Sequence, residues 1–365
     1  MNQGPEADQD GERVAASARL SGLGSDPSAD VRGWMGRRCS GLGEWSLSRL
    51  LAAKAGSGLS VSVVLPALNE EGTVGEIVAA IRAELVVGAP LVDEVVVVDS
   101  GSSDRTVEVA GLAGARVVRR DEVLPGVPVV PGKGEVLWRS LFVTGGDVVC
   151  FVDADLRRFD AGVVRGVLGP LLTDSSVELV KAAYDRPLLD GGGVLPGGGG
   201  RVTELVARPL LNLHWPELAG FVQPLAGEYA ARRGLLERLA FPCGYGVELG
   251  LLVDALDVVG LDGLAQVDVG SRFHRHQGDA ALGVMASEIW QAALVRLERS
   301  GRWVGGVPVG AGLTQFHRRD GGFRARRVEV AALERPAAVG FAEYRERVVG
   351  AGLGVREGGV RWSGR

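Results

Sequence analysis

The chain has 365 residues, 46% of them hydrophobic, and a formal net charge of −5 at pH 7. Its length and apolar content predict one large or two modest domains with a substantial core, and the acidic balance argues against a general nucleic-acid binder. The cysteines Cys39, Cys150 and Cys243 are far apart and match neither a disulfide framework nor a zinc site, which indicates a reducing, cytoplasmic setting.

Residues 1–55 are rich in Gly, Ser and charged side chains, which predicts a mobile arm with a short amphipathic helix over 41–55. The beginning, MNQGPEADQDGERV, lacks the basic start and apolar core of a signal peptide. No uninterrupted apolar run reaches the roughly 18 residues of a membrane helix, so we expect no integral membrane segment.

From residue 61 onward, continuous apolar strands alternate with helices. Strands are predicted at 61–67, 94–100, 115–120, 147–153 and 177–184, with helices at 73–87, from 104, at 133–144 and at 160–172. This alternation predicts an α/β fold, a mostly parallel sheet covered by helices on both faces. Ligands of such sheets bind at the carboxyl ends of the strands, where Asp99, Asp153 and Asp155 fall.

The second half of the chain begins with a Gly-rich stretch before residue 202, where a helix is predicted to start. Residues 280–320 are predicted to be helical, followed by an Arg/Gly-rich tail that is either a dimerisation arm or disordered. The predicted organisation is therefore a flexible arm (1–55), a nucleotide-sugar and acceptor domain (56–280) and a helical C-terminal region with its tail (281–365).

Two carboxylates follow the predicted strand 147–153 in the stretch VVCFVDADLRRFD. Side chains at positions i and i+2 of an extended chain point the same way, so Asp153 and Asp155 would repel each other. A divalent cation bound by carboxylate and phosphate oxygens removes that cost, as in many sugar-nucleotide transferases. The alternative is a solvated strand end with Asp155 capping the next turn.

Two glycine-flanked motifs suggest phosphate contacts. PGKGE lacks the Ser or Thr that a P-loop needs after its lysine, but Lys133 at a helix start is placed to meet a phosphate. In GGGGRVTE, a Gly-rich loop enters a helix, and Arg201 and Thr203 add polar donors, which fits a phosphorylated acceptor. The alternatives are a solvated lysine and a linker with a threonine cap.

Four further motifs carry polar residues that have both a functional and a structural interpretation. LPALNEEGT offers Glu70 to a nucleoside or as an ordinary helix cap, and VVDSGSSDRT offers Asp99 and Ser100 to a nucleoside or as a turn. His274 in SRFHRHQ is a candidate metal ligand or a surface histidine. FPCGYGVELG places Tyr245 and Glu248 beside glycines, at a site or at a plain helix start.

Taken in order, these motifs resemble the glucosyl-3-phosphoglycerate synthase family. The resemblance covers roughly residues 44–320 and rests on the segments LPALNEE, VVDSGSSDRT, PGKGEVLWRSL, FVDAD, GGGRVTELVARPLL, QPLAGEYAARR, GYGVELGLLVD and the His274 segment. It implies a retaining glycosyltransferase of the Rossmann-like GT-A fold with a helical C-terminal extension. The implied reaction moves glucose from UDP-glucose to the 2-hydroxyl of 3-phosphoglycerate, for glucosylglycerate and methylglucose lipopolysaccharide synthesis.

The resemblance also implies roles for individual residues. The uridine pocket would be lined by Pro66, Ala67, Leu68, Glu70 and Ser100. Near the donor's phosphate, ribose or sugar would lie Lys133, Asp153, Tyr245 and Glu248, with Glu248 on the glucose hydroxyls. The implied catalytic set is Asp153, Asp155, Lys133 and Glu248.

The implied metal is Mg²⁺ or Mn²⁺, held by Asp155 and His274. The acceptor's phosphate and carboxylate would meet Gly200, Arg201, Thr203, Arg272 and His276. Family members often have Asn where this chain has His276, so that contact departs from the pattern. The family also implies a homodimer.

Four other activities remain open on the residues alone. A mannosyl-3-phosphoglycerate synthase would use GDP-mannose in the same fold. A polyprenyl-phosphate glycosyltransferase should show a membrane segment or a basic amphipathic helix. A nucleotidylyltransferase would carry a Gly-rich, Arg-containing loop after the first strand, where LPALNEEGT stands, and a non-catalytic regulator would have lost the metal residues. Because no carboxylate stands out as a nucleophile, we expect same-face attack on the sugar, with the UDP phosphate accepting the acceptor's proton.

Overall fold

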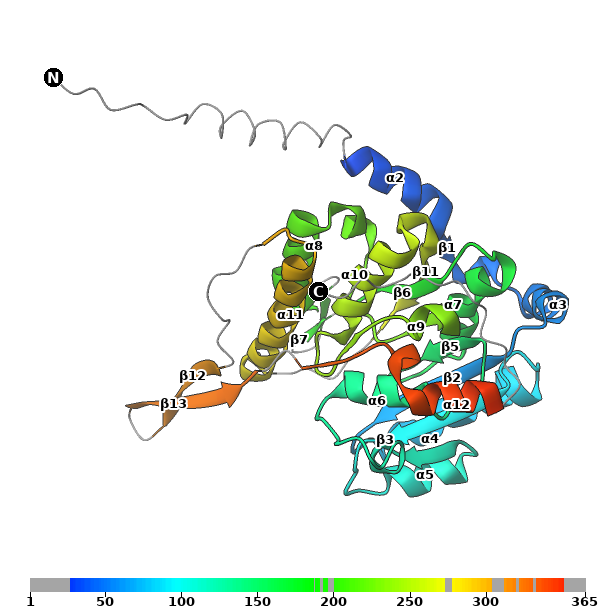
Figure 1. The fold of residues 1–365 in the computed structure, drawn as a ribbon, viewed down its shortest axis with the longest axis horizontal. Coiled ribbons are helices and arrows are strands. Elements are labelled where there is room, and N and C mark those ends of the chain that lie inside the picture. Colours follow the sequence, from blue (N-terminus) through cyan, green and yellow to red (C-terminus); the bar gives the residue numbers. More distant parts are fainter. Residues whose placement is uncertain are drawn as a thin grey trace.

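A computed structural model describes residues 27–186, 188–190, 193–195, 200–272, 278–303, 312–319, 322–330 and 333–350. An eight-stranded sheet runs through the molecule in the order β1-β11-β6-β9-β5-β2-β3-β4, with helices on both sides (Figure 1). Its strands are β1 (Cys39–Gly41), β2 (Val61–Ala67), β3 (Glu94–Asp99), β4 (Arg116–Arg119), β5 (Val148–Phe151), β6 (Leu179–Asp185), β9 (Tyr229–Arg232) and β11 (Leu264–Ser271). The neighbouring pairs are parallel except where β9 lies antiparallel between β5 and β6, so the predicted mostly parallel sheet is confirmed.

Both faces of the sheet are buried because the central strands are continuous apolar runs. Along β2, Val64 packs into the core on one face, and its neighbours Val63 and Leu65 pack into the core on the other. The first face is covered by α6 (Lys133–Ser140), α8 (Arg208–His214), α10 (Val247–Val259) and α11 (Asp279–Arg299). The second is covered by α3 (Leu47–Ser57), α4 (Val74–Ile81), α5 (Thr106–Leu112) and α7 (Gly162–Thr173).

Short elements complete the chain. The helical ones are η1 (Leu42–Glu44), η2 (Arg82–Val87), η3 (Arg120–Glu122), η4 (Thr203–Ala207), η5 (Pro216–Gly220), α9 (Arg233–Leu236), η6 (Leu261–Gly263), η7 (Ala338–Gly340) and α12 (Ala342–Gly350). Two small antiparallel pairs are β7 (Leu188–Asp190) with β8 (Gly193–Leu195), and β10 (Phe241–Pro242) with β14 (Glu334–Arg335).

Residues 27–57 are folded: α3 lies largely within the helix predicted over 41–55, whereas α2 and β1 stand where a mobile arm was predicted. Helix α2 (Pro27–Arg38) buries Trp34 completely, and the Trp34 indole N–H lies 2.9 Å from the carbonyl oxygen of Leu264. The next residues form β1, which pairs parallel with β11 at the edge of the sheet. The buried side chains of Trp34, Trp45 and Leu50 anchor this segment to the body. A prediction from the overall polar composition of residues 1–55 overlooks such single apolar residues.

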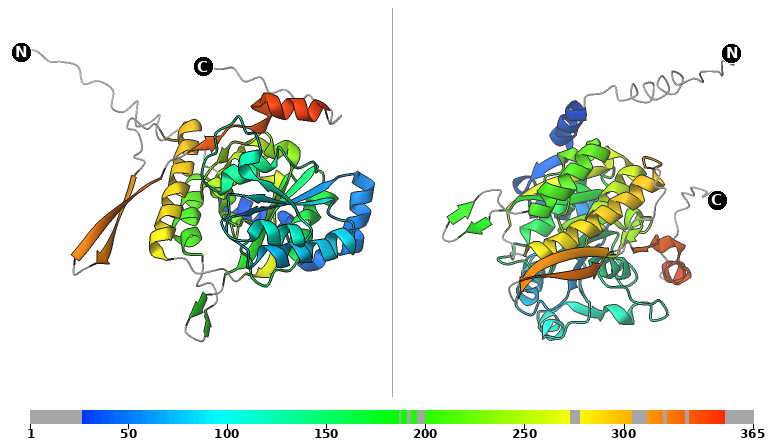
Figure 2. Two further views of the ribbon diagram at one scale, coloured as in Figure 1. Left: turned by 90° about the horizontal axis from the view of Figure 1, so that it is seen from below. Right: turned by 90° about the vertical axis from the view of Figure 1, so that its left-hand side faces the viewer.

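The C-terminal region is helical only in part. Helix α11 was predicted, but part of the predicted helical stretch is a strand, β12 (Gly312–Arg319), paired antiparallel with β13 (Gly322–Glu329). Figure 2 shows this hairpin projecting from the body beside α11. Between the paired residues Arg319 and Gly322 the sequence reads Asp-Gly, a hairpin turn signal, which outweighs helix propensity here.

Within the described residues, α11 is the one helix long and apolar enough to cross a membrane by length and composition. It is not an uninterrupted apolar run, because Glu288 and Arg296 lie within it. Arg296 donates to Asp254 of α10 at 2.5 Å, so the helix packs onto the body through a buried ion pair. Core helices of globular proteins meet the same length and composition criterion.

Candidate active site

The turns after β2 and β3 are bonded to each other at the carboxyl edge of the sheet. Asn69 has a left-handed backbone (φ 58°), which asparagine tolerates better than most residues, and its Oδ1 accepts from the N–H of Ser103 at 2.8 Å. The N–H of Glu70 donates to the hydroxyl of Thr106 at 2.7 Å. The predicted uridine residues lie at the end of β2 and on these turns, and Leu68 is 53% exposed although apolar. Asp99 is buried and accepts from the N–H of Gly101, so its carboxylate stabilises the turn.

The two aspartates of the D-x-D motif lie at the end of β5, and their carboxylates act on each other. Loss of water around Asp155 and the charge of Asp153 raise the pKa of the Asp155 carboxyl, although Lys133 and Arg186 oppose this. A divalent cation would relieve that repulsion, and carboxylate oxygens suit Mg²⁺ and Mn²⁺. The pair therefore fits the predicted metal, while His274, its second predicted ligand, lies outside the described residues.

Lys133 joins two carboxylates from different parts of the chain. Its Nζ lies 2.5 Å from Asp153 Oδ1 and 2.7 Å from Glu248 Oε1. Burial alone would lower the pKa of the Lys133 amine, but the two carboxylates outweigh it and raise that pKa well above its usual value. The structure thus brings together three of the four predicted catalytic residues.

Close backbone packing delivers Lys133 to this position. A Cβ on Gly134 would lie 1.8 Å from the carbonyl oxygen of Pro242, and the N–H of Gly134 donates to the carbonyl of Cys243 at 2.8 Å. Only glycine permits this approach, which sets the start of α6 against the loop that leads to Glu248. Tyr245 lies on that loop, and its N–H donates to Glu288 at 2.7 Å. Burial and the charge of Glu288 raise the pKa of the Tyr245 hydroxyl, and the charges of Lys133 and Glu248 also act on it.

Next to Asp153, the loop before β9 supplies two residues that sequence reasoning missed, Gly227 and Glu228. A Cβ on Gly227 would lie 2.1 Å from Asp153 Oδ2. The next residue, Glu228, is fully buried, and within the described residues both its carboxylate oxygens lack a hydrogen-bond partner. Burial and the charge of Asp153 raise the pKa of Glu228. The signal was a charged residue entering the apolar run EYAA in QPLAGEYAARR.

Lys181 of β6 is the third missed residue. It is buried, donates to the carbonyl of Ala226 at 2.9 Å and lies 4.7 Å from the centre of the Tyr229 ring. Burial lowers the pKa of the Lys181 amine to about 8, although Glu248 acts in the opposite direction. Lys181 therefore holds the loop that presses Gly227 against Asp153, and its signal was a lone lysine in the strand VELVKAAY.

Replacing Gly227 with alanine should lower kcat/KM for the sugar donor by about 100-fold, because the new methyl group would displace the Asp153 carboxylate from Lys133. Gly234→Ala is the matched control, since a Cβ there would meet nothing within 4 Å. Steady-state kinetics and a thermal melt of both variants check this. Near-normal turnover by Gly227→Ala would show that Asp153 tolerates displacement.

The predicted acceptor loop lies at the start of the helical segment that contains η4. The Thr203 hydroxyl is buried, 1% exposed, and within the described residues it has no hydrogen-bond partner. Gly200 has a left-handed backbone (φ 77°) and lies against Thr203. The guanidinium of Arg201 instead forms an ion pair with Asp279 at the start of α11. The structure therefore places Gly200 and Thr203 together, with the Arg201 charge turned toward α11.

Polar atoms without a hydrogen-bond partner among the described residues gather where β6 and β11 end and β9 begins. In the part of the chain that the structure describes, Arg272 is 7% exposed, and its Nε and Nη2 lack partners. The charge of Arg272 acts on Glu228. Buried polar atoms without partners are rare in native proteins and point to ligand groups that would complete them. Arg272 was a predicted acceptor residue, while His276 lies outside the described residues.

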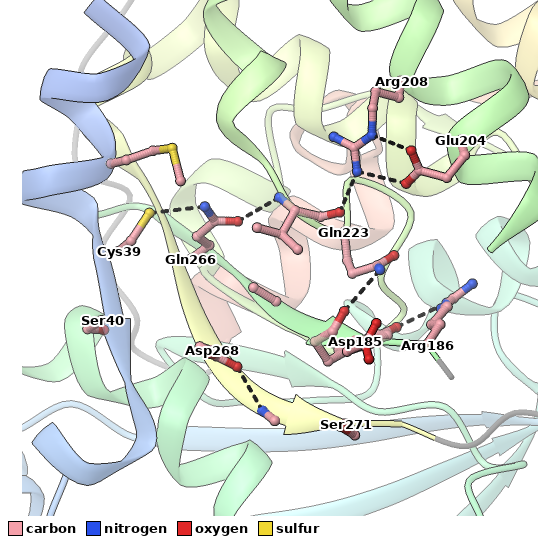
Figure 3. Close-up of a pocket in the computed structure, with 15 residues that line it drawn as sticks. Cys39, Ser40, Asp185, Arg186, Glu204, Arg208, Gln223, Gln266, Asp268 and Ser271 are labelled. Atoms are coloured by element: carbon pink, nitrogen blue, oxygen red, sulfur yellow. Dashed lines mark hydrogen bonds and ion pairs between the residues drawn. The ribbon is translucent and has the colours of Figure 1, made fainter. Parts of the chain in front are cut away.

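A cavity of about 570 Å³ opens beside these atoms, between β1, β6, β11 and the helical segment of η4 and α8. Figure 3 shows Arg186, Arg208 and Gln223 on its wall. Arg208 is bonded to both oxygens of Glu204, at 2.8 and 2.9 Å. The guanidinium of Arg186 donates to the hydroxyl of Tyr184 at 3.1 Å. Sequence reasoning did not single out Arg186.

Comparison with known proteins matches this fold and site. The family described as glycosyl transferase family 2 matches residues 62–174. A glucosyl-3-phosphoglycerate synthase from Mycolicibacterium smegmatis is 51% identical, over 80% of this chain and 92% of the relative. The chain belongs to the glucosyl-3-phosphoglycerate synthase family.

Two solved structures support the same assignment. Glucosyl-3-phosphoglycerate synthase from Mycobacterium tuberculosis, crystallised with Mn²⁺, UDP-glucose and phosphoglyceric acid, has a TM-score of 0.70 and 46% identity, covering 81% of this chain and 95% of that one. Mannosyl-3-phosphoglycerate synthase from Rubrobacter xylanophilus has a TM-score of 0.78 and 41% identity, covering 84% and 96%. The resemblance to the glucosyl-3-phosphoglycerate synthase family and the GT-A fold that it implied are thus confirmed.

Proposed function

We propose that this chain is a cytoplasmic enzyme that transfers glucose from UDP-glucose to the 2-hydroxyl of 3-phosphoglycerate with retention of configuration. The observation that carries the proposal is the Lys133 bridge between Asp153 and Glu248, a few residues from Asp155 and beside unpartnered polar atoms. The Mycobacterium tuberculosis relative named above was crystallised with UDP-glucose and phosphoglyceric acid, and the Mycolicibacterium smegmatis relative is a glucosyl-3-phosphoglycerate synthase. A homodimer is part of the proposal.

Each side of the site has a separate task. On the donor side, the turns after β2 and β3 hold the uridine through Pro66, Ala67, Leu68, Glu70 and Ser100. Lys133 presents its charge to the donor, Glu248 and Tyr245 hold the glucose, and Asp153 positions Lys133. Asp155, with His274, would hold Mg²⁺ or Mn²⁺, which supplies positive charge to the departing diphosphate.

On the acceptor side, the buried Thr203 hydroxyl and the guanidinium N–H groups of Arg272, which have no partner among the described residues, are donors that an anionic acceptor would satisfy. Gly200, Arg201 and His276 complete this set. Binding both substrates side by side converts the transfer into an effectively intramolecular reaction. The water-poor surroundings of Lys133 strengthen its pull on the leaving group's charge.

Retention follows from same-face attack, in which the UDP phosphate accepts the proton of the acceptor hydroxyl. A double-displacement mechanism needs a free carboxylate nucleophile beside the sugar. Lys133 contacts the carboxylates of both Asp153 and Glu248. Glu228 has no exposed surface. A trapped covalent glucosyl-enzyme would overturn this mechanism.

The test of the reaction is an assay with UDP-glucose, MgCl₂ and 3-phosphoglycerate, with EDTA as the control. We expect UDP release only when acceptor and metal are both present, together with a phosphorylated glucosyl product. A second candidate, mannosyl transfer from GDP-mannose, is supported by the likeness to the Rubrobacter xylanophilus structure. Running both donors in parallel separates the two, and release with neither would contradict the proposed function.

A further inference from the structure

The cation that the sequence predicted for the acceptor loop, Arg201, is already engaged by a carboxylate of the chain. The guanidinium of Arg201 pairs with Asp279 and is 37% exposed. Yet 3-phosphoglycerate carries two anionic groups, a carboxylate and a phosphate. Arg272 supplies one positive charge to the acceptor, so a second cation is needed to neutralise both groups.

Arg186, directly after β6, is such a cation. A Cβ on Gly200 would lie 3.5 Å from Arg186 Cδ, so the side chain packs against the first described residue of the predicted acceptor loop. Its Nη2 donates to the Tyr184 hydroxyl at 3.1 Å, and the guanidinium lies 5.4 Å from the centre of the Tyr184 ring. Its Nε is buried and, within the described residues, has no hydrogen-bond partner. The side chain is thus held in place with one donor unused.

Arg186 also reaches the reacting side of the site. Its charge acts on Asp155, the predicted metal ligand, and the charges of Glu228 and Asp153 act on it. It therefore lies close both to Gly200 of the acceptor loop and to the carboxylates of the reacting side. Arg186 and Arg272 both act on the buried carboxylate of Glu228, so two guanidinium groups carry positive charge into this part of the site.

We propose that Arg186 binds the carboxylate of the acceptor and so selects 2-hydroxy acids as acceptors. The inference rests on the proposed function. In 3-phosphoglycerate the carboxyl carbon is bonded directly to the carbon that carries the reacting hydroxyl, whereas the phosphate is attached to the next carbon through an oxygen. Arg186 lies near the carboxylates of the reacting side, so it is placed to bind the carboxylate of the acceptor. Thr203, the other neighbour of Gly200, then binds the acceptor's phosphate.

The test compares Arg186→Gln with Arg208→Gln in the full-length enzyme with Mg²⁺. Arg208 lines the same cavity, but Glu204 already occupies its guanidinium, so it is the matched control. Arg186→Gln should raise KM for 3-phosphoglycerate by about 100-fold, as expected for a lost charge-assisted hydrogen bond. KM for UDP-glucose should stay within about twofold, and Arg186→Lys should fall between the wild type and Arg186→Gln.

Two competitive inhibitors identify the group that Arg186 binds. Glycerol 3-phosphate lacks the carboxylate, so its Ki should be the same in the wild type and in Arg186→Gln. D-Glycerate lacks the phosphate, so its Ki should rise in parallel with KM for 3-phosphoglycerate.

A loss of glycerol 3-phosphate binding in place of D-glycerate binding would overturn the carboxylate assignment. Unchanged KM for 3-phosphoglycerate, or an equal rise in KM for UDP-glucose, would overturn the inference while leaving the proposed function intact. Absence of turnover by the wild type itself would overturn both.

Discussion

Replacing Lys133 with methionine is expected to lower kcat by at least about 100-fold, because the charge that faces the donor is lost. The same change leaves the carboxylates of Asp153 and Glu248 facing each other without a cation. It should therefore destabilise the protein by about 2–3 kcal/mol, less than the full cost of breaking a buried pair, because Lys133 and Asp153 are 21% and 25% exposed. Steady-state kinetics and urea unfolding measure the two effects.

Two further variants separate charge in the site from general damage. Lys54→Met removes a lysine of α3 that pairs with Asp93, away from the site, and should leave turnover unchanged. Adding Glu248→Gln to Lys133→Met removes one of the opposed carboxylates, so it should recover part of the lost stability without recovering activity. If the double variant regained turnover, the Lys133 charge would not be required for the reaction.

Asp155→Asn should remove metal-dependent turnover, lowering kcat by about 100-fold or more, and should weaken Mn²⁺ binding in a direct titration. In the metal-free protein the same change should raise the melting temperature at pH 7. The folded state raises the pKa of Asp155, so its charged form is penalised on folding at every pH above that pKa. Asparagine removes this penalty.

The pH dependence of metal binding follows from the same shift. A cation needs the charged carboxylate, and the raised pKa of Asp155 means that protonation competes at a higher pH than for an ordinary aspartate. Mn²⁺ affinity should therefore fall as the pH is lowered from 7.5. Asp121→Asn, at an exposed carboxylate beside Arg119, is the control and should bind Mn²⁺ normally. Full metal-dependent activity in Asp155→Asn would remove Asp155 from the metal site.

The parts of the fold that could be predicted are those coded locally. The valine runs of β2 and β3 predict buried parallel strands, because consecutive apolar residues in a strand place apolar side chains on both faces of the sheet. Strand β1 could not be found this way, since it is three residues long and its partner β11 lies more than 220 residues later. The hairpin β12–β13 was not predicted, because the helix predicted over residues 280–320 covers β12 and reaches its turn.

In the site, too, the residues within local sequence motifs could be predicted and those defined by tertiary contacts could not. Lys133, Asp153 and Glu248 were predicted because their motifs resemble a family, and the structure joins them. Arg186 stood in the unremarkable stretch YDRP, and its importance arises only from its contact with Gly200, fourteen positions away along a loop. Contacts of this kind depend on tertiary packing and leave no periodic trace in the sequence.

The antiparallel strand β9 determines when the sheet can be completed during folding. Strands β2 to β5 are consecutive in the chain and can pair as they emerge, but β6 bonds only to β9 and β11 within the described sheet. Non-local pairing of this kind is slow, because loop closure is unfavourable until the contacts form. Glu228 and Glu248 belong to this late half, whereas Lys133 and Asp153 belong to the early one. Recovery of transferase activity during refolding should therefore lag behind the formation of helix and sheet in the first 150 residues.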